Sequence, residues 1–599
     1  MKVPRFLRRL LAGEGEPPQP PQPPAAPEPP PPVPGSPEDP LAYGWEVLRH
    51  KLPDSGTPGQ VLVASLTVKN TGTRVWNGIS PSAVYGQHAP GPHSVGLAVS
   101  WGTEVVANCL LPRPHIHPGE EATVLFSVTT PEEVGTHCLR LELVEYEVTT
   151  FADRGVEPVK VDIQIEAAKS ERTEQLWSRM QRFDPWQYLP TQGVRRGPSG
   201  TTYPVFVERA EGCRVWDTTG TEYLDYTMGW GAILLGYAHP KVSGAIRDML
   251  TTTPICTLPN PVEIELAEML VEDIPCAEMV AFAKNGSDAC SFAIRMARVL
   301  TGRKTVLFSG YHGWQDFWVE QVGFERTGVP TRTPPIIYRF EFHRIDQFRA
   351  LLAEHRDDLA AVIIEPSPWA GDGLGFEPDT DPVFLREVAD STREAGGLFI
   401  LDEIVTGYRY PEHSVQAAKG VIPDLTCLGK ALASGMPLSA VVGRADILKQ
   451  ALPKTFFAST FHGEAYTFAA AKAAVEIYRS EPVAKHVWDY GAKLKEGVDR
   501  IMAEQGLPAS LLGPPFRMSL ILRRDDPEVL LLERTLLQQE LLKRGLLTYN
   551  GVMLPCYAHD DSTLATTLEI FGAAAEVVAR ASQAGDWGEH LEIPPLLDL

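Results

Sequence analysis

Two segments of the chain place an acidic residue and a lysine at the ends of successive apolar runs. In LFILDEIVTGYRY, Asp402 follows four apolar residues, and in LTCLGKALASGMPLSAVVGR, Lys430 lies in a glycine-rich loop. A lysine amine can form a Schiff base with an aldehyde cofactor, while a carboxylate can pair with the ring nitrogen of that cofactor. These residue types predict pyridoxal phosphate (PLP) chemistry, with Lys430 and Asp402 as catalytic residues.

The elements around these two residues are predicted to be strands and helices in alternation. Apolar runs such as AVIIEP and GLFILDEI alternate with helical stretches such as DPVFLREVADSTREAG between about residues 191 and 585. Alternation of this kind implies a mostly parallel sheet covered by helices, so the predicted fold class is α/β. The length suits a large enzyme domain followed by a smaller C-terminal lobe.

The acidic pair at the end of LFIL can present only one carboxylate to a ligand. Side chains alternate between the two faces of a strand, so Asp402 and Glu403 point to opposite sides. A carboxylate beside a buried run is costly unless it is paired, and a protonated pyridine nitrogen is a suitable partner. Ile404 returns to the face of Asp402, where it can pack against a cofactor ring.

A phosphate needs backbone donors, and the start of a helix provides them. Asn285, Gly286, Ser287 and Asp288 precede the amphipathic run ACSFAIRMARVL. Glycine allows the backbone to approach an anion closely, and a helix N-terminus favours negative charge. The other interpretation is a plain helix cap by Ser287, and the two are compatible.

Residues 191–585 resemble class III (subgroup II) aminotransferases of PLP fold type I, especially their glutamate-1-semialdehyde 2,1-aminomutase-like branch. The resemblance extends along nearly the whole segment and follows the order of the family. It rests on YLDYTMGWGAILLGYAHP, AKNGSDACSFAIRMARVLTGR, FSGYHGW, IIEP, LDEIVTGYR, LGKALASGMPLSAVVGR and FASTFHGEA.

This resemblance implies a role for each matching residue. It implies that Lys430 holds PLP as a Schiff base, Asp402 binds the ring nitrogen, and Tyr311 stacks on the ring, with His312 beside it in a structural position. It implies cofactor contacts for Gly286, Ser287, Tyr311, Asp402, Ile404, Lys430 and Thr460. The last of these would be donated by the second subunit, so a homodimer with shared active sites is expected.

The substrate side of the resemblance is less complete. Trp230 matches an aromatic residue of the substrate entrance, and Arg195 or Arg196 aligns with an arginine that binds a carboxylate, unless the two are a solvated basic pair. Glu365 of the Glu-Pro pair and Glu464 have either a substrate role or a structural one. The segment YNGVMLPCYAHDD and Ala370 depart from the substrate apparatus of known relatives.

The N-terminal third of the chain differs in composition. Residues 1–16 form a basic tip, read as a disordered end or a membrane-surface contact, and residues 17–40 form a proline-rich linker of extended chain. Residues 41–166 alternate apolar and polar positions between turn signals, which predicts an all-β sandwich. This segment loosely resembles immunoglobulin-like modules that accompany bacterial carbohydrate-related enzymes. Residues 167–190 are predicted to be a linker helix and residues 586–599 a tail.

Composition restricts the possible partners. The net charge of −22 argues against a nucleic-acid partner, because phosphate binding needs a basic face. Eight scattered cysteines without a CxxC spacing predict no metal site and a reduced cytoplasm. No apolar run in the sequence is expected to span a membrane.

Three functions remain open from the sequence. The first is intermolecular transamination from an amino donor to a carbonyl acceptor, such as a sugar-like or secondary-metabolite intermediate. The second is an intramolecular glutamate-1-semialdehyde 2,1-aminomutase. The third is an inactive binding or scaffold protein that works through its β-sandwich.

Overall fold

The computed structural model describes residues 43–592 apart from 57–60, 79–93, 103, 112–114, 132, 147, 166–171, 184–205, 320–328, 330–334, 369–375, 459, 462 and 550. Arg195, Arg196 and Ala370 therefore lie outside the described residues, as do the basic tip and the proline-rich linker.

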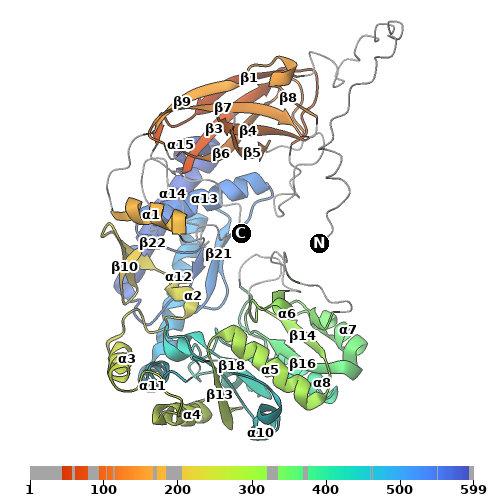
Figure 1. Cartoon of the computed structure of the whole chain (residues 1–599), viewed down its shortest axis with the longest axis vertical. Coiled ribbons are helices and arrows are strands. Elements are labelled where there is room, and N and C mark those ends of the chain that lie inside the picture. Colours follow the sequence, from red (N-terminus) through yellow and green to blue (C-terminus); the bar gives the residue numbers. More distant parts are fainter. Residues whose placement is uncertain are drawn as a thin grey trace, which may run out of the picture.

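The N-terminal domain consists of two stacked sheets that enclose one apolar core (Figure 1). One sheet has the order β1-β3-β6 and the other the order β2-β9-β7-β4-β5, with β8 paired to β7. Their strands are β1 (Trp45–Lys51), β2 (Ser55–Gly56), β3 (Val61–Asn70), β4 (Val95–Trp101), β5 (Glu104–Leu110), β6 (Glu121–Thr129), β7 (Gly135–Glu145), β8 (Thr149–Thr150) and β9 (Val159–Ile165). Strand β6 alternates buried and exposed residues, as expected where one face meets a core and the other meets solvent.

A seven-stranded sheet forms the centre of the second domain. Its order is β13-β19-β18-β17-β16-β14-β15, and only β19 among these strands runs antiparallel to its neighbours. The strands are β13 (Met279–Ala283), β14 (Thr305–Ser309), β15 (Ile337–Arg339), β16 (Leu359–Ile364), β17 (Leu398–Glu403), β18 (Leu425–Leu428) and β19 (Ser439–Gly443). The predicted mostly parallel α/β sheet is confirmed.

Both faces of this sheet are buried. Along β16, Ala361 and Ile363 pack into one apolar cluster with helix α5, whereas Val362 and Ile364 pack into a second cluster with helices of the opposite face. A parallel strand that is covered on both sides reads as a continuous apolar run, which explains AVII in the sequence. The helices of this domain are α3 (Pro240–Thr252), α4 (Pro261–Asp273), α5 (Gly286–Thr301), α6 (Asp316–Val319), α7 (Ile345–His355), α8 (Pro382–Glu394), α9 (Val415–Lys419), α10 (Ala445–Ala451) and α11 (Ala465–Ser480).

The C-terminal lobe lies between the sheet domain and the β-sandwich (Figure 1). Its core combines helices with short strands from both ends of the enzyme segment. These elements are β10 (Val207–Glu211), β11 (Arg214–Asp217), β12 (Glu222–Asp225), α2 (Met228–Gly231), α12 (Val483–Glu504), β20 (Ala509–Leu512), β21 (Met518–Leu522), α13 (Pro527–Lys543), β22 (Leu546–Leu547), β23 (Val552–Met553), α14 (Asp561–Ala584) and α15 (Trp587–His590).

Helix α14 is long and apolar enough to cross a membrane by length and composition alone, although no apolar run in the sequence was expected to do so. Its buried side chains, including Phe571 and Val578, pack into the core of the C-terminal lobe against α12 and α13. A helix in the core of a folded domain can have the same length and apolar composition, and these contacts account for the apolar character of α14.

Two further elements lie in segments of changed composition. Helix α1 (Arg172–Phe183) falls within the segment predicted as a linker helix, and α15 falls within the predicted tail. The side chain of Lys51 donates to the carbonyl of Gly588 in α15 and lies 3.9 Å from Glu589. Leu125 of β6 packs against the core of the C-terminal lobe, so the sandwich and this lobe are in direct contact.

Candidate active site

Lys430 is the second residue after β18, at the carboxyl edge of the central sheet. Gly429 precedes it, and Lys430 itself has a φ of 46°, in the left-handed region. Burial is the main cause that lowers the pKa of Lys430 to about 8; the guanidinium groups of Arg517 and Arg409 act in the same direction, against Glu365 and Asp402. The amine is therefore poised between its charged and neutral forms near neutral pH, as a nucleophile and proton carrier requires.

Asp402 is the penultimate residue of β17 and is only 2% exposed. The Cys290 thiol donates to its Oδ2 at 3.3 Å, His312 Nδ1 lies 2.8 Å from the same oxygen, and the amide of Ile404 donates to Oδ1 at 3.1 Å. Ligand-type atoms of Cys290, His312 and Asp402 lie within 4.8 Å of one another. These contacts hold the carboxylate in one orientation at the buried end of the site.

Glu403 points to the opposite side of the strand, as the alternation of side chains requires. The amide of Val415 donates to its Oε2 at 2.6 Å, and Gln416 Nε2 donates to its Oε1 at 3.1 Å. Burial raises the pKa of Glu403 to about 7, although these hydrogen bonds oppose the rise. Glu403 thus supports α9 and takes no part in the face that carries Asp402.

The start of α5 is built from small residues in close contact with the strand end. A Cβ at Gly286 would lie 2.8 Å from Cδ1 of Ile404, and a Cβ at Gly313 would lie 2.5 Å from Oγ of Ser287. The N-cap of α5 is Asn285, whose side chain accepts from the Asp288 amide at 3.0 Å. The alternative interpretation of Ser287 as the helix cap was therefore wrong, because Asn285 already makes that bond and Ser287 lies inside the first turn.

Glu365 is bound from two sides at the end of β16. The backbone amide of Tyr311 donates to its Oε2 at 2.9 Å, and Nη1 of Arg517 donates to its Oε1 at 2.6 Å. The guanidinium of Arg517 also lies 4.1 Å from the ring centroid of Phe376. Tyr311 remains 47% exposed, so its ring borders the open part of the site.

Arg517 is a site residue that sequence reasoning missed. It lies just before β21 in the C-terminal lobe, within PPFRMSLIL, where no spacing or glycine marks it. The signal that could have found it is a single arginine inside an otherwise apolar stretch, since a buried charge requires a partner. Arg409 was missed as well: it is 2% exposed and donates to the carbonyls of Val405 and Gly231.

Trp230 lies in a turn with unusual backbone geometry. Its φ is 57° and that of Met228 is 44°, both in the left-handed region. The indole is 49% exposed and packs edge-to-face on Tyr549 at a centroid distance of 4.5 Å. This pair joins the first segment of the enzyme domain to the C-terminal lobe at the surface.

The last two predicted residues lie on the segment before α11. Thr460 is exposed on the described surface. Glu464 is 5% exposed, forms an ion pair with Lys284 and accepts from the Tyr466 hydroxyl at 3.1 Å. Glu464 therefore has protein partners that hold the segment, which favours the structural one of its two predicted roles.

The chemistry of the donor set fits pyridoxal phosphate. Lys430 can take the aldehyde, Asp402 the ring nitrogen, and the first turn of α5 at Gly286 and Ser287 the phosphate. A side chain at Gly286 would fill the space beside Ile404, so the small residue keeps the backbone of this turn accessible.

The chain has relatives of several activities. It is 32% identical over 372 residues to a 3-aminobutyryl-CoA aminotransferase of Cloacimonas acidaminovorans, covering 61% of this chain and 88% of the relative. It is 35% identical to a 2'-deamino-2'-hydroxyneamine transaminase of Streptomyces kanamyceticus, covering 62% and 91%. It is 34% identical to a glutamate-1-semialdehyde 2,1-aminomutase of Exiguobacterium sibiricum, covering 53% and 74%.

A solved structure shares the fold of the enzyme domain. The FumI protein of Sphingopyxis sp. MTA144, in its PLP internal aldimine form, superposes with a TM-score of 0.61 and 27% identity, covering 68% of this chain and 97% of that one. The family model of class-III aminotransferases matches residues 197–511. The chain therefore belongs to the class-III aminotransferases, enzymes of PLP fold type I.

Proposed function

We propose that this protein transfers an amino group from an external amino donor to a carbonyl acceptor of sugar-like or secondary-metabolite character. The observation that carries the proposal is the buried arrangement of Lys430, with its lowered pKa, and Asp402, fixed by three hydrogen-bond donors. An inactive scaffold would have no need to keep an amine of lowered pKa and an oriented carboxylate at one edge of the sheet.

The bound cofactor supplies an electron sink that stabilises negative charge on the substrate carbon. Lys430 is placed to take a proton from that carbon and return it, because its lowered pKa of about 8 lets the amine exchange between its charged and neutral forms. Asp402 would hold the ring nitrogen in its protonated form, and the hydrogen bonds from Cys290 and His312 fix the orientation of Asp402.

The substrate class follows from Arg517. Its guanidinium is held by Glu365 next to Tyr311, and its charge already acts on the amine of Lys430. A carboxylate on the amino donor can pair with Arg517, because arginine presents several donors in a planar fork. We infer that the donor is an amino acid and that Trp230 borders the acceptor. The transaminase of a hydroxyneamine among the relatives supports an acceptor of sugar-like character.

We infer a homodimer with shared active sites, in the cytoplasm. Thr460 lies on a surface that also exposes Phe461 by 57% and Phe456 by 83%. Exposed apolar groups of this kind mark interaction surfaces, and a partner would bring Thr460 to a second site.

The eight cysteines are all free, in agreement with a reducing compartment. We also assign the N-terminal sandwich to immunoglobulin-like modules, on the basis of its two stacked sheets, in which every strand pair except β2–β9 is antiparallel.

The proposal is tested by visible absorbance of the purified chain with PLP. We expect a band that is absent from Lys430→Ala, present in the surface control Lys449→Ala, and bleached by one amino acid donor with release of a carbonyl product. Light scattering after chromatography reports the dimer.

Two other outcomes would assign another function. Conversion of glutamate-1-semialdehyde without an outside donor would establish the aminomutase, which the relative of Exiguobacterium sibiricum supports. Absence of the band even with added PLP would leave the scaffold function.

A further inference from the structure

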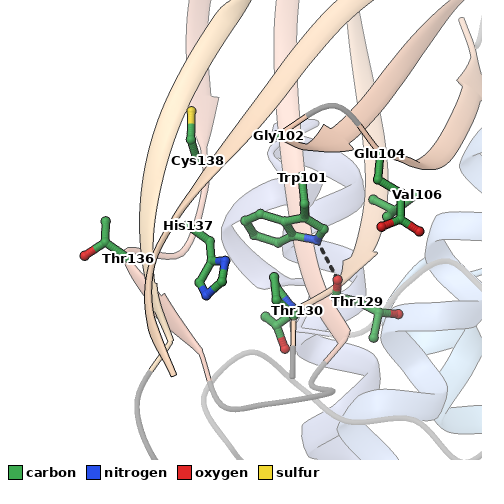
Figure 2. A pocket seen from close by; sticks show the side chains of 10 residues that line it. Trp101, Gly102, Glu104, Val106, Thr129, Thr130, Thr136, His137 and Cys138 are labelled. Atoms are coloured by element: carbon green, nitrogen blue, oxygen red, sulfur yellow. Dashed lines mark hydrogen bonds between the residues drawn. The ribbon is translucent and has the colours of Figure 1, made fainter. Parts of the chain in front are cut away.

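A pocket lies at one end of the β-sandwich, between the β4–β5 turn, the end of β6 and the start of β7 (Figure 2). Its volume is about 560 Å³, which is in the range of small-molecule sites. Its lining belongs entirely to the sandwich, and it consists of Trp101, Gly102, Glu104, Val106, Thr129, Thr130, Pro131, Thr136, His137 and Cys138.

Trp101 provides an apolar platform in this pocket. Its Nε1 donates to the carbonyl of Thr129 at 2.7 Å, so the polar edge of the indole is already satisfied. The ring packs edge-to-face with His137 at a centroid distance of 6.4 Å and an interplanar angle of 83°. An indole fixed at its polar edge presents mainly its ring surface to a ligand, and a ring surface suits a second flat or CH-rich group.

The rest of the pocket wall offers hydrogen-bond acceptors. His137 Nε2 lies 2.8 Å from the carbonyl of Glu133, so Nε2 carries the proton and Nδ1 of the neutral ring is an acceptor. Thr136 points to the opposite face of β7, where its hydroxyl donates to Gln164 at 2.8 Å, so His137 is the acceptor that faces Trp101. Glu104 adds a carboxylate on the exposed side.

The charge of the pocket selects the class of ligand. Of the described residues that line it, Glu104 is the one carboxylate and none is lysine or arginine. An anionic ligand would meet this carboxylate without a compensating cation, whereas a hydroxyl-rich or ammonium-bearing ligand would be favoured. A pyranose meets these conditions, because one face carries CH groups and its edge carries hydroxyl donors.

We propose that this pocket binds a pyranose unit of an amino sugar. The CH face stacks on Trp101, the ammonium group pairs with Glu104, and a ring hydroxyl donates to Nδ1 of His137. This site is separate from Lys430 and does not depend on transamination. It gives the chain a saccharide-binding function in addition to its enzyme domain.

The proposal is tested by calorimetric titration of the full chain with three trisaccharides: glucosamine, neutral glucose and anionic galacturonate oligomers. We expect the glucosamine trisaccharide to bind most tightly, the glucose trisaccharide more weakly, and the galacturonate trisaccharide not at all. Lys430→Ala should bind all three as the native chain does, so loss of the enzyme reaction leaves this result intact.

Three variants assign binding to the pocket. Trp101→Ala should weaken binding of the glucosamine trisaccharide about two- to tenfold, since stacking on an aromatic ring contributes on this scale. Glu104→Gln, a surface change that spares the fold, should lose the preference for glucosamine over glucose. Val134→Ala, an exposed change outside the lining, should leave binding unchanged.

Specific outcomes would overturn the proposal. One is the absence of binding heat with all three trisaccharides at millimolar concentration. Another is tighter binding of the galacturonate trisaccharide than of the glucosamine trisaccharide. The third is a Glu104→Gln variant that still prefers glucosamine over glucose. Thermal unfolding of Trp101→Ala shows whether the sandwich remains folded, and Trp101→Phe, which keeps a ring, should retain part of the affinity.

Discussion

Nδ1 of His312 lies 2.8 Å from Oδ2 of Asp402, and both side chains are buried at the closed end of the active site. A carboxylate can only accept, so His312 donates this bond. The other ring nitrogen lies 3.2 Å from the carbonyl of Ser309 at the end of β14. His312 thereby links the acidic residue on β17 to the end of β14, which is separated from β17 by β16.

Replacement of His312 by phenylalanine should weaken cofactor binding. The change keeps an aromatic ring beside Trp318 but removes the donor to Asp402, and a buried group left without its partner costs about 1–3 kcal/mol, roughly a 5- to 150-fold loss. The dissociation constant of PLP, measured by fluorescence titration, checks this. His355→Phe on α7 is the control, and an unchanged constant in His312→Phe would contradict the structural link.

The attachment of PLP to Lys430 should depend on pH with a midpoint near 8. Burial lowers the pKa of this lysine, so the neutral, reactive amine forms above about pH 8 and is lost as the pH falls. Stopped-flow absorbance of the apo-protein mixed with PLP measures the profile. Arg517→Met removes a nearby cation and should shift the midpoint to higher pH, whereas Arg517→Lys should shift it less.

The buried Glu403 should make folding stability fall between pH 4.5 and 7. Its pKa is raised to about 7 by burial, so the folded state binds a proton that the unfolded state releases above its usual pKa of 4.5. The stabilising effect is complete below that pKa and is lost as the pH rises towards 7, by on the order of 3 kcal/mol. Urea unfolding at several pH values should show a flatter profile for Glu403→Gln, and an identical slope would count against this assignment.

Gly286→Ala should impair the phosphate end of the site, because the new Cβ would lie 2.8 Å from Cδ1 of Ile404. The neighbour must shift, or the turn must move, and cofactor affinity should fall about tenfold for a strain of roughly 1–2 kcal/mol. Ile404→Val removes the clashing atom, so the double variant should recover much of the affinity. Equal affinities of the single and double variants would show that this contact is not the cause.

Donor selection should depend on Arg517. Arg517→Ala should raise KM for amino acid donors at least about tenfold, because a charged hydrogen-bonding pair contributes about 1.5–3 kcal/mol. Amines without a carboxylate should lose much less, and comparison of kcat/KM for an amino acid and its decarboxylated amine checks this. If kcat/KM fell equally for the amino acid and for its decarboxylated amine, Arg517 would act by positioning Glu365 and not by binding the donor carboxylate.

Asp402 and Lys430 could be placed from sequence because each lies at the carboxyl end of a buried strand or just beyond it, and such ends meet at one edge of a parallel sheet. The alternation of side chains along a strand likewise separates Asp402 from Glu403 on sequence alone. Arg517 could not be found in this way, since its position beside Glu365 comes from the packing of the C-terminal lobe on the sheet. The hydrogen bonds of Asp402 to Cys290 and His312 also join three different elements, and no local pattern encodes such a meeting.

The seating of the β-sandwich on the C-terminal lobe has a mechanical consequence. Leu125 packs into the lobe, Ser65 lies against Gly588, and Lys51 bonds to the same short helix. The lobe also carries Arg517. A movement of this lobe relative to the sheet domain would therefore move the sandwich together with it. Removal of the sandwich would therefore expose the apolar side chains of the lobe that Leu125 covers, and the shortened enzyme should be less soluble than the full chain.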